Sequence, residues 1–274
     1  MIEFRSISKR FDDGTLAVDN FSLVMPSRQT TVLVGSSGSG KTTLLRMINR
    51  MVDATSGELE IDGENVTTIE PVKLRRRIGY VMQNSGLLPH RRVIDNIATV
   101  PRLNGMPKKQ AHERALELMD TVGLDRDMAE RYPAQLSGGQ QQRVGVARGL
   151  AVDPNILLMD EPFGAVDPIV RADLQQELLR LQRELDKTVV FVTHDIDEAF
   201  LLGDQVVILE KGGRIAQKGT PAEILANPAS DFVASFIGAD RGKRALSIHT
   251  VDGAQVLVDG DGNLAGRLVE AGPA

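Results

Sequence analysis

The chain reads Gly35-Ser36-Ser37-Gly38-Ser39-Gly40-Lys41-Thr42 directly after a short β-branched run, Thr30 to Val34. That run predicts a strand. Lys41 to Met51 predicts a helix whose apolar stripe holds Leu44, Leu45, Ile48 and Met51. Glycines between a strand and a helix let the backbone curl, so that successive N–H groups point inward and can cradle phosphate oxygens. The helix N-terminus adds favourable partial positive charge. The stretch therefore predicts a site for the β- and γ-phosphates of a nucleotide.

Two side chains at the end of this loop have chemistry that suits such a site. Lys41 supplies a point charge to the β/γ-phosphates, and Thr42 offers a hydroxyl to Mg²⁺. The alternative is a glycine-rich turn that matches the pattern by chance. The strand before the loop and the helix after it favour nucleotide binding over that alternative.

A pair of carboxylates follows a second apolar run, Ile156 to Met159. Four apolar residues predict a buried strand, and the C-terminal ends of such strands are where α/β sheets place ligands. Asp160 is suited to hold Mg²⁺ through its water shell, and Glu161 to orient or deprotonate an attacking water. Alone, a strand that ends in Asp-Glu is more often a helix cap than a catalytic pair. Together with the phosphate loop it favours catalysis.

A third segment reads Leu136-Ser137-Gly138-Gly139-Gln140. Ser137 can cap the helix that follows, which would explain the serine without any ligand. It does not explain two consecutive glycines, which permit close approach of the backbone to a ligand.

Together, the three segments resemble the ATP-binding cassette family, over roughly residues 1–240. The resemblance implies an α/β fold with a P-loop NTPase core and a mostly parallel sheet. It also implies an N-terminal antiparallel β portion and a helical subdomain at about residues 85–155 that carries the Ser137 segment. Residues 241–274 then form a short C-terminal extension, in which Val256 to Gly266 resembles one hairpin of a truncated CBS domain.

The resemblance also implies ATP and Mg²⁺ as ligands and assigns further residues. The catalytic residues would be Glu161, His194 and Lys41. The ligands or neighbours of Mg²⁺ would be Thr42, Gln83 and Asp160. ATP would contact Phe11, through ring stacking on adenine, and Gly35, Ser36, Ser37, Gly38, Ser39, Gly40, Lys41, Thr42 and Thr43. A second chain would add Ser137, Gly138, Gly139 and Gln140 to that site, and Asp167 would link the two halves. For Phe11 the alternative is an ordinary half-buried side chain.

The amino-acid composition excludes some kinds of partner and some kinds of chemistry. The 274 residues hold 32 basic and 37 acidic side chains, a net charge of −5 that gives no bulk attraction to nucleic acid. No cysteine is present, which excludes disulfides and a thiolate nucleophile. The longest apolar stretches fall far short of a bilayer span, and the N-terminus has no signal-like apolar core. We expect a soluble chain that stays where it is made. The resemblance to the family implies that it lies at the cytoplasmic face of the cell membrane, bound to integral membrane permease subunits.

Four stretches resemble the ATPase subunits of quaternary-amine importers, which take up glycine betaine, carnitine or choline. They are residues 47–50 (MINR), 62–65 (DGEN), 87–90 (LLPH) with 96–98 (NIA), and 231–238 (DFVASFIG). The resemblance implies a pair of cassettes, most simply two identical chains, and a separate solute-binding protein. The alternatives are an importer for another substrate, an exporter subunit, a non-transport cassette ATPase acting on DNA or ribosomes, and a regulator that binds nucleotide without hydrolysing it.

Overall fold

The computed structural model describes residues 1–83, 85–164, 168–239, 246–251, 254–258 and 264–267. Its strands are β1 (Ile2–Arg10), β2 (Leu16–Met25), β3 (Thr30–Gly35), β4 (Ser56–Ile61), β5 (Glu64–Asn65), β6 (Ile78–Val81), β7 (Ile156–Asp160), β8 (Thr188–Thr193), β9 (Gln205–Leu209), β10 (Ile215–Gly219), β11 (Ser247–Val251), β12 (Ala254–Val258) and β13 (Leu264–Arg267). Its helices are α1 (Lys41–Ile48), α2 (Pro71–Arg77), α3 (Val93–Ile97), α4 (Thr99–Leu103), α5 (Lys108–Thr121), α6 (Gly138–Leu150), α7 (Pro168–Leu185), α8 (Ile196–Leu202), α9 (Pro221–Ala226) and α10 (Asp231–Ile237).

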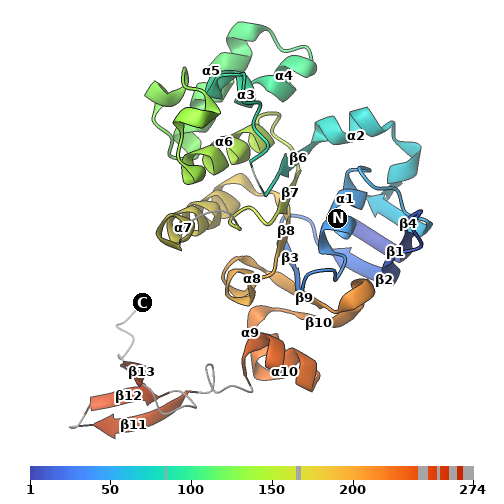
Figure 1. The fold of residues 1–274 in the computed structure, drawn as a ribbon, viewed down its shortest axis with the longest axis vertical. Helices are drawn as coiled ribbons and strands as arrows, with labels where there is room; N and C mark the ends of the chain where they lie inside the picture. Colours follow the sequence, from blue (N-terminus) through green and yellow to red (C-terminus); the bar gives the residue numbers. More distant parts are fainter. Residues whose placement is uncertain (84, 165–167, 240–245, 252–253, 259–263, 268–274) are drawn as a thin grey trace.

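The central sheet has the strand order β10-β9-β3-β8-β7-β6 (Figure 1). Its strands from β9 to β6 run parallel, and β10 is antiparallel to β9. This confirms the predicted mostly parallel sheet. Parallel neighbours end at the same edge, so the segments that follow β3, β7 and β8 come together there.

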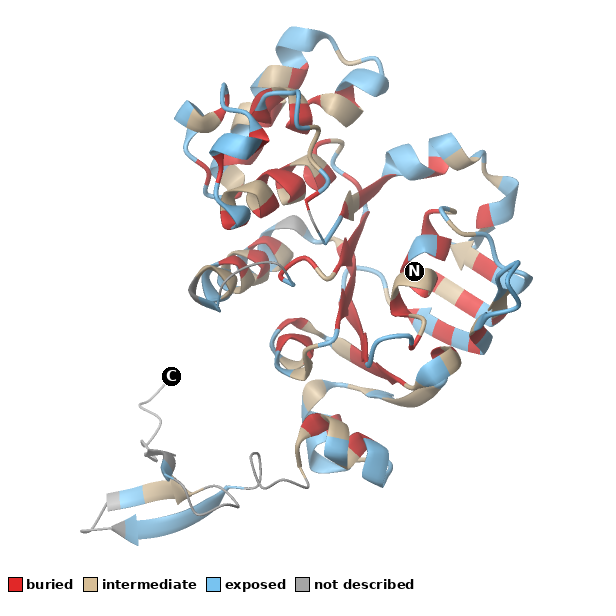
Figure 2. Ribbon diagram, viewed as in Figure 1, coloured by how far each residue is buried: buried red, intermediate tan, exposed pale blue. Residues whose placement is uncertain are grey.

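Alternation along the central strands divides the interior into two hydrophobic cores. On β3, Val32 and Val34 belong to one core and Leu33 to the other. The first core also holds residues of α5 to α8, and the second holds α1 together with β1 and β2. The central strands are therefore buried on both faces, as Figure 2 shows, which explains their unbroken apolar sequences.

A separate antiparallel sheet, in the order β2-β1-β4-β5, covers one face of the molecule. It packs its apolar side against α1, with Phe4 and Phe21 edge to face at a ring separation of 5.2 Å. The predicted N-terminal antiparallel portion is thereby confirmed. Helices α3 to α6 gather at one end of the molecule, away from this sheet (Figure 1). They lie within the predicted helical segment of about residues 85–155.

The helix after the phosphate loop is shorter than the sequence predicts. α1 ends at Ile48, whereas the apolar pattern predicted a helix through Met51. Arg50 adopts φ 53°, which no α-helix continues through, and Met51 is 52% exposed. The prediction that Met51 joins the apolar stripe was wrong, because the chain has already turned away from the core.

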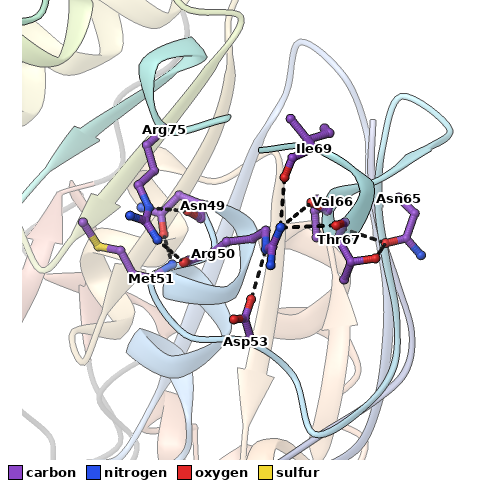
Figure 3. A network of polar contacts seen from close by, with 9 residues as sticks. All are labelled: Asn49, Arg50, Met51, Asp53, Asn65, Val66, Thr67, Ile69 and Arg75. Carbon is purple, nitrogen blue, oxygen red and sulfur yellow. Dashed lines mark hydrogen bonds and ion pairs between the residues drawn. The ribbon is translucent and has the colours of Figure 1, made fainter. Parts of the chain in front are cut away.

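Two arginines fasten the segment after α1 (Figure 3). Arg50 donates to the carbonyl oxygens of Val66, Thr67 and Ile69, at 3.4, 3.3 and 2.9 Å. Arg75, on α2, donates to the carbonyl oxygens of Asn49 and Arg50. Arg75 belongs to the basic run 73–77, and its hydrogen bonds cap the C-terminal end of α1. One hydrogen-bond network thus includes residues from two of the four stretches that resemble quaternary-amine importers, residues 47–50 and 62–65.

The C-terminal strands form their own three-stranded sheet, β11-β12-β13, apart from the rest of the chain (Figure 1). β12 and β13 pair antiparallel, as a hairpin over Val256 to Gly266 requires, and residues 259–263 between them lie outside the described residues. In the part of the chain that the structure describes, no helix combines the length and apolar character needed to cross a bilayer.

Candidate functional site

A cavity of about 330 Å³ opens where β3, β7 and β8 end. Its lining combines most of the phosphate loop with the residues after β7 and β8: Ser37, Gly38, Gly40, Lys41, Thr42, Thr43, Glu161 and His194. These residues come from three distant parts of the sequence. The parallel register, with Val34 opposite Thr193 and Asp160 opposite Val192, brings them together.

The glycines of the phosphate loop are required by its surroundings. Gly40 has φ 90°, and a Cβ there would lie 2.7 Å from the carbonyl oxygen of Ala17 on β2. A Cβ on Gly35 would lie 2.3 Å from the carbonyl oxygen of Leu209 on β9. The loop is thus packed closely against β2 and β9.

Lys41 is buried, at 5% exposure, and its ammonium group lies across the loop. Its Nζ donates to the carbonyl oxygens of Gly35 and Ser36, at 2.8 and 2.9 Å. Desolvation lowers the pKa of Lys41, partly opposed by the charges of Glu161 and Asp160. A buried cation whose hydrogen bonds go to neutral oxygens favours an anionic ligand in the adjoining cavity. The residues therefore fit a bound nucleotide phosphate.

The hydroxyl of Thr42 donates to Asp160 Oδ1 at 2.9 Å. A threonine hydroxyl beside a carboxylate at the end of a buried strand is a donor set that suits Mg²⁺, a hard cation that prefers oxygen. Asp160 is 7% exposed, and its other oxygen, Oδ2, accepts from the Tyr80 hydroxyl at 3.1 Å and lies 3.6 Å from Arg46. Burial, with the charge of Asp160 beside it, raises the pKa of Tyr80 to about 12, so this phenol stays a donor at neutral pH.

Sequence reasoning missed Arg46 and Tyr80, although both carried a signal. Arg46 lies four residues after Thr42, which places the two on one face of α1. Tyr80 is the polar residue in an otherwise apolar strand, and a tyrosine hydroxyl there needs a hydrogen-bond partner.

Glu161 and His194 are in direct contact. His194 Nδ1 lies 3.1 Å from Glu161 Oε2, and the Glu161 amide donates to the carbonyl oxygen of Val192 at 3.0 Å. Glu161 adopts φ 44°, a conformation that is uncommon outside glycine and costly to hold. Its backbone hydrogen bond to β8 holds this turn, and the turn aims its carboxylate into the cavity.

A second buried carboxylate, Glu198 on α8, supports the residue before His194. Its Oε2 accepts from the Thr193 hydroxyl at 2.6 Å, and its Oε1 accepts from Gln175 on α7 at 3.3 Å. Glu198 is 6% exposed, and burial raises its pKa. Sequence reasoning missed Glu198, since a glutamate in the first turn of a helix reads as an ordinary helix-start charge.

The Ser137 segment begins α6. Ser137 Oγ accepts from the Gln140 amide, and Gln140 Oε1 accepts from the Ser137 amide at 2.9 Å, so the two form a capping box. Gly139 is buried, and a Cβ there would lie 2.3 Å from Val170 Cγ1. Within this single chain, none of Ser137, Gly138, Gly139 and Gln140 lines the cavity, although all four are described.

Gln83 and Phe11, which the sequence also predicts at the site, do not line the cavity. Gln83 follows β6, and its Nε2 lies 3.3 Å from the position a Cβ on Gly164 would take. Phe11 lies in the turn between β1 and β2, 39% exposed, with Lys9 Nζ 5.2 Å from its ring centroid. Asp167 lies outside the described residues.

The loop after Gln83 is held from two sides. Arg148, on α6, donates to the carbonyl oxygens of Ser85 and Gly86 at 2.6 and 2.7 Å, and burial lowers its pKa. Asn96, fully buried on α3, accepts from the Leu88 amide at 2.7 Å. The helix that carries the Ser137 segment is thereby tied to the loop that leads from the cavity toward the helical end.

Comparison with known proteins places these features in a family. The sequence model of the family described as ABC transporter matches residues 18–164. The glycine betaine/carnitine/choline transport ATP-binding protein OpuCA of Bacillus subtilis is 51% identical over 241 residues, covering 88% of this chain and 63% of its own. The glycine betaine uptake system ATP-binding protein YehX of Escherichia coli is 50% identical over 252 residues, covering 92% and 81%. The chain therefore spans less than two thirds of the length of the Bacillus protein.

One of the similar solved structures is a dimer with bound nucleotide. A dimeric post-hydrolysis state of the ATP-binding cassette MJ0796, bound to ADP and Pi, is 33% identical to this chain with a TM-score of 0.74. The match covers 81% of this chain and 99% of that one. Its extent indicates that the chain's central fold is close to that of a cassette known as a dimer.

Proposed function

Because this chain belongs to the ABC transporter family, we propose that it is the ATP-hydrolysing subunit of a membrane importer for a small quaternary amine. One observation carries the proposal: Lys41, Thr42, Glu161 and His194 converge on a single cavity at the edge of a parallel sheet. A phosphate loop, a metal-side hydroxyl and a carboxylate–histidine pair are the parts that phosphoryl transfer to water requires.

Each residue has a distinct part in the proposed reaction. The phosphate loop and Lys41 bind the β- and γ-phosphates and fix the γ-phosphoryl group in the cavity. Thr42 and Asp160 would hold Mg²⁺, which when bound supplies positive charge against the charge that develops on the phosphates. Glu161 orients the attacking water and accepts its proton. Since an ionised carboxylate only accepts hydrogen bonds, Nδ1 of His194 donates to Glu161, and Nε2 donates to a phosphate oxygen when the imidazole is doubly protonated.

We infer that two copies of the chain share each site. The Ser137 segment begins a helix outside the cavity, so a second chain is needed to bring Ser137 to Gln140 against the γ-phosphate. Its exposed serine and glycine at the start of α6 suit an approach to phosphate oxygens. The dimeric state of MJ0796 supports this arrangement. In the proposed pair, residues 1–240 of each copy of this chain act as the cassette, and residues 241–274 are an extension. Asp167 contributes to the link between the two copies.

We further infer that integral membrane permease subunits and a solute-binding protein complete the system at the cytoplasmic face of the membrane. The segment Ser85 to Pro101, whose first residues are held by Arg148, would contact the permease. The names of OpuCA and YehX support glycine betaine, carnitine or choline as the transported class. An importer for another substrate is the alternative that the same site allows.

Uptake of labelled glycine betaine at high salt tests the proposal. A strain that lacks this chain receives the intact form, the Lys41→Ala variant or the exposed-surface variant Glu113→Gln. We expect the intact form and Glu113→Gln to restore uptake and Lys41→Ala not to. Equal restoration by all three would contradict ATP-driven import. If none restores glycine betaine uptake but the intact chain restores that of another solute, the substrate assignment is wrong.

A further inference from the structure

The carboxylate of Asp160 has different partners on its two oxygens. Oδ1 accepts from Thr42, at the start of α1, whereas Oδ2 accepts from Tyr80 and faces Arg46. The distances are 2.9 Å for Thr42, 3.1 Å for Tyr80 and 3.6 Å for Arg46. One side of the carboxylate therefore belongs to the phosphate loop, and the other is held by two residues that do not line the cavity.

The two supporting residues approach Asp160 from rigid elements. Tyr80 lies on β6, which pairs in parallel with β7 and ends beside it. Arg46 lies on α1, one turn beyond Thr42, so its guanidinium stands over the same carboxylate. A side chain that donates to a carboxylate from a strand, together with a cation from a helix, leaves that carboxylate few orientations. Oδ1 is then the oxygen directed toward the nucleotide.

We infer that Tyr80 and Arg46 are positioning residues: they fix the Asp160 carboxylate so that Oδ1 and the Thr42 hydroxyl present one prearranged pair of oxygens to a divalent cation. The inference rests on the proposed ATP-binding function. Residues that hydrogen-bond a metal-binding carboxylate set its orientation, and their loss commonly costs about 10- to 100-fold in metal affinity. Neither side chain lines the cavity, so their effect should fall on the metal and not on the phosphates.

The Tyr80 hydroxyl can be removed without disturbing the packing of its ring. The ring packs against the core that contains α1 and β1, and the hydroxyl is the atom that reaches Asp160. Tyr80→Phe therefore deletes one hydrogen bond and keeps the apolar contacts. The other tyrosine of the chain, Tyr132, lies at the start of a 3-10 turn in the helical group, 42% exposed. Tyr132→Phe is thus a matched control.

The test measures how much Mg²⁺ improves the binding of a nonhydrolysable ATP analogue. Dissociation constants are determined by calorimetry on the full chain, once with EDTA and once with excess Mg²⁺. We expect Tyr80→Phe to bind the analogue in EDTA as the wild type does, and to lose about 10-fold or more of the Mg²⁺-dependent gain. Tyr132→Phe should match the wild type in both media. Arg46→Met should act in the same direction as Tyr80→Phe, which keeps the test valid if one variant folds poorly.

The outcomes separate the inference from the function on which it rests. If no chain binds the analogue in either medium, the proposed ATP-binding function fails. If the wild type binds and Tyr80→Phe shows the full Mg²⁺-dependent gain, only the inference fails. Equal weakening of Tyr80→Phe in EDTA and in Mg²⁺ would also overturn it, since that pattern indicates a general structural role. A wild type that gains nothing from Mg²⁺ overturns it as well.

Discussion

His194 Nδ1 lies 3.1 Å from Glu161 Oε2, although the two residues are 33 positions apart in the chain. The contact exists because β7 and β8 are parallel neighbours whose C-terminal ends meet beside the phosphate loop. It ties the carboxylate that would activate water to the histidine that would face the phosphate.

Glu161→Gln should reduce ATP turnover by about 10²- to 10⁴-fold, the range that general-base catalysis supplies. The substituted amide would keep the shape of the side chain but could not accept a proton from water. Binding of MgATP should persist, because Lys41 and the loop amides are unchanged. Single-turnover kinetics and equilibrium binding measure the two quantities separately.

The exposed Glu113→Gln variant, on α5, controls for the loss of one negative charge. It should hydrolyse ATP at the wild-type rate. If Glu161→Gln hydrolysed ATP at the wild-type rate, Glu161 would not be the general base of the reaction.

Lys41→Met should weaken MgATP binding by about 10-fold or more, since a charge-assisted hydrogen bond contributes roughly 1.5–3 kcal/mol. The chain without ligand should lose little stability, because the buried ammonium is desolvated in the native state. Calorimetric binding and thermal unfolding report the two effects. Lys218→Met, at an exposed position on β10, should change neither. Unchanged MgATP affinity in Lys41→Met would contradict the phosphate role.

Gly139→Ala should lower the free energy of unfolding by about 1–3 kcal/mol, the usual cost of overpacking. The added Cβ would lie 2.3 Å from Cγ1 of Val170. Val170 is β-branched and lies in a helix, where its χ1 angle has one strongly preferred rotamer. Gly138→Ala, one residue earlier and exposed, is the stability control and should not destabilise the chain. Urea unfolding of both variants measures the difference. Equal stability of the two would mean that α6 and α7 do not pack as closely as described.

Stability should depend on pH through Glu198. Burial raises the pKa of Glu198 in the folded chain above its value of 4.5 in the unfolded chain. Its stabilising contribution is fully present below pH 4.5 and is lost as the pH rises through the folded pKa. The wild type should therefore gain stability relative to Glu198→Gln as the pH falls from neutral toward 5. Urea unfolding at several pH values tests this, and parallel pH curves for the two chains would refute it.

Much of the fold could be predicted, because a strand that is buried on both faces has a sequence without polar–apolar alternation. Ile156 to Met159 is apolar without alternation, Thr30 to Val34 is a β-branched run, and both are central strands. The end of α1 could not be predicted. The apolar Met51 extends the helical pattern, and the left-handed turn at Arg50 depends on its surroundings.

The residues of the site also include some that the sequence predicts and some that it does not. Lys41, Thr42, Asp160 and Glu161 follow strands and adjoin one another along the chain, so local sequence pointed to them. Arg46 and Tyr80 act on Asp160, which is far from both in sequence, and only the fold shows that they meet this carboxylate. Glu198 meets the Thr193 hydroxyl through the turn from β8 into α8. The contact of Ser137 with a partner's nucleotide stays a prediction.

The molar mass of Glu161→Gln in solution, with MgATP, is the most direct test of a hydrolytic site shared by two chains. Light scattering should show one chain without nucleotide or with ADP, and two chains when MgATP is bound and cannot be cleaved. Adding Ser137→Arg, which places a bulky charge where the second chain would meet the γ-phosphate, should keep the mass at one chain. A mass that stays at one chain in Glu161→Gln, while calorimetry shows MgATP bound, would contradict the shared site.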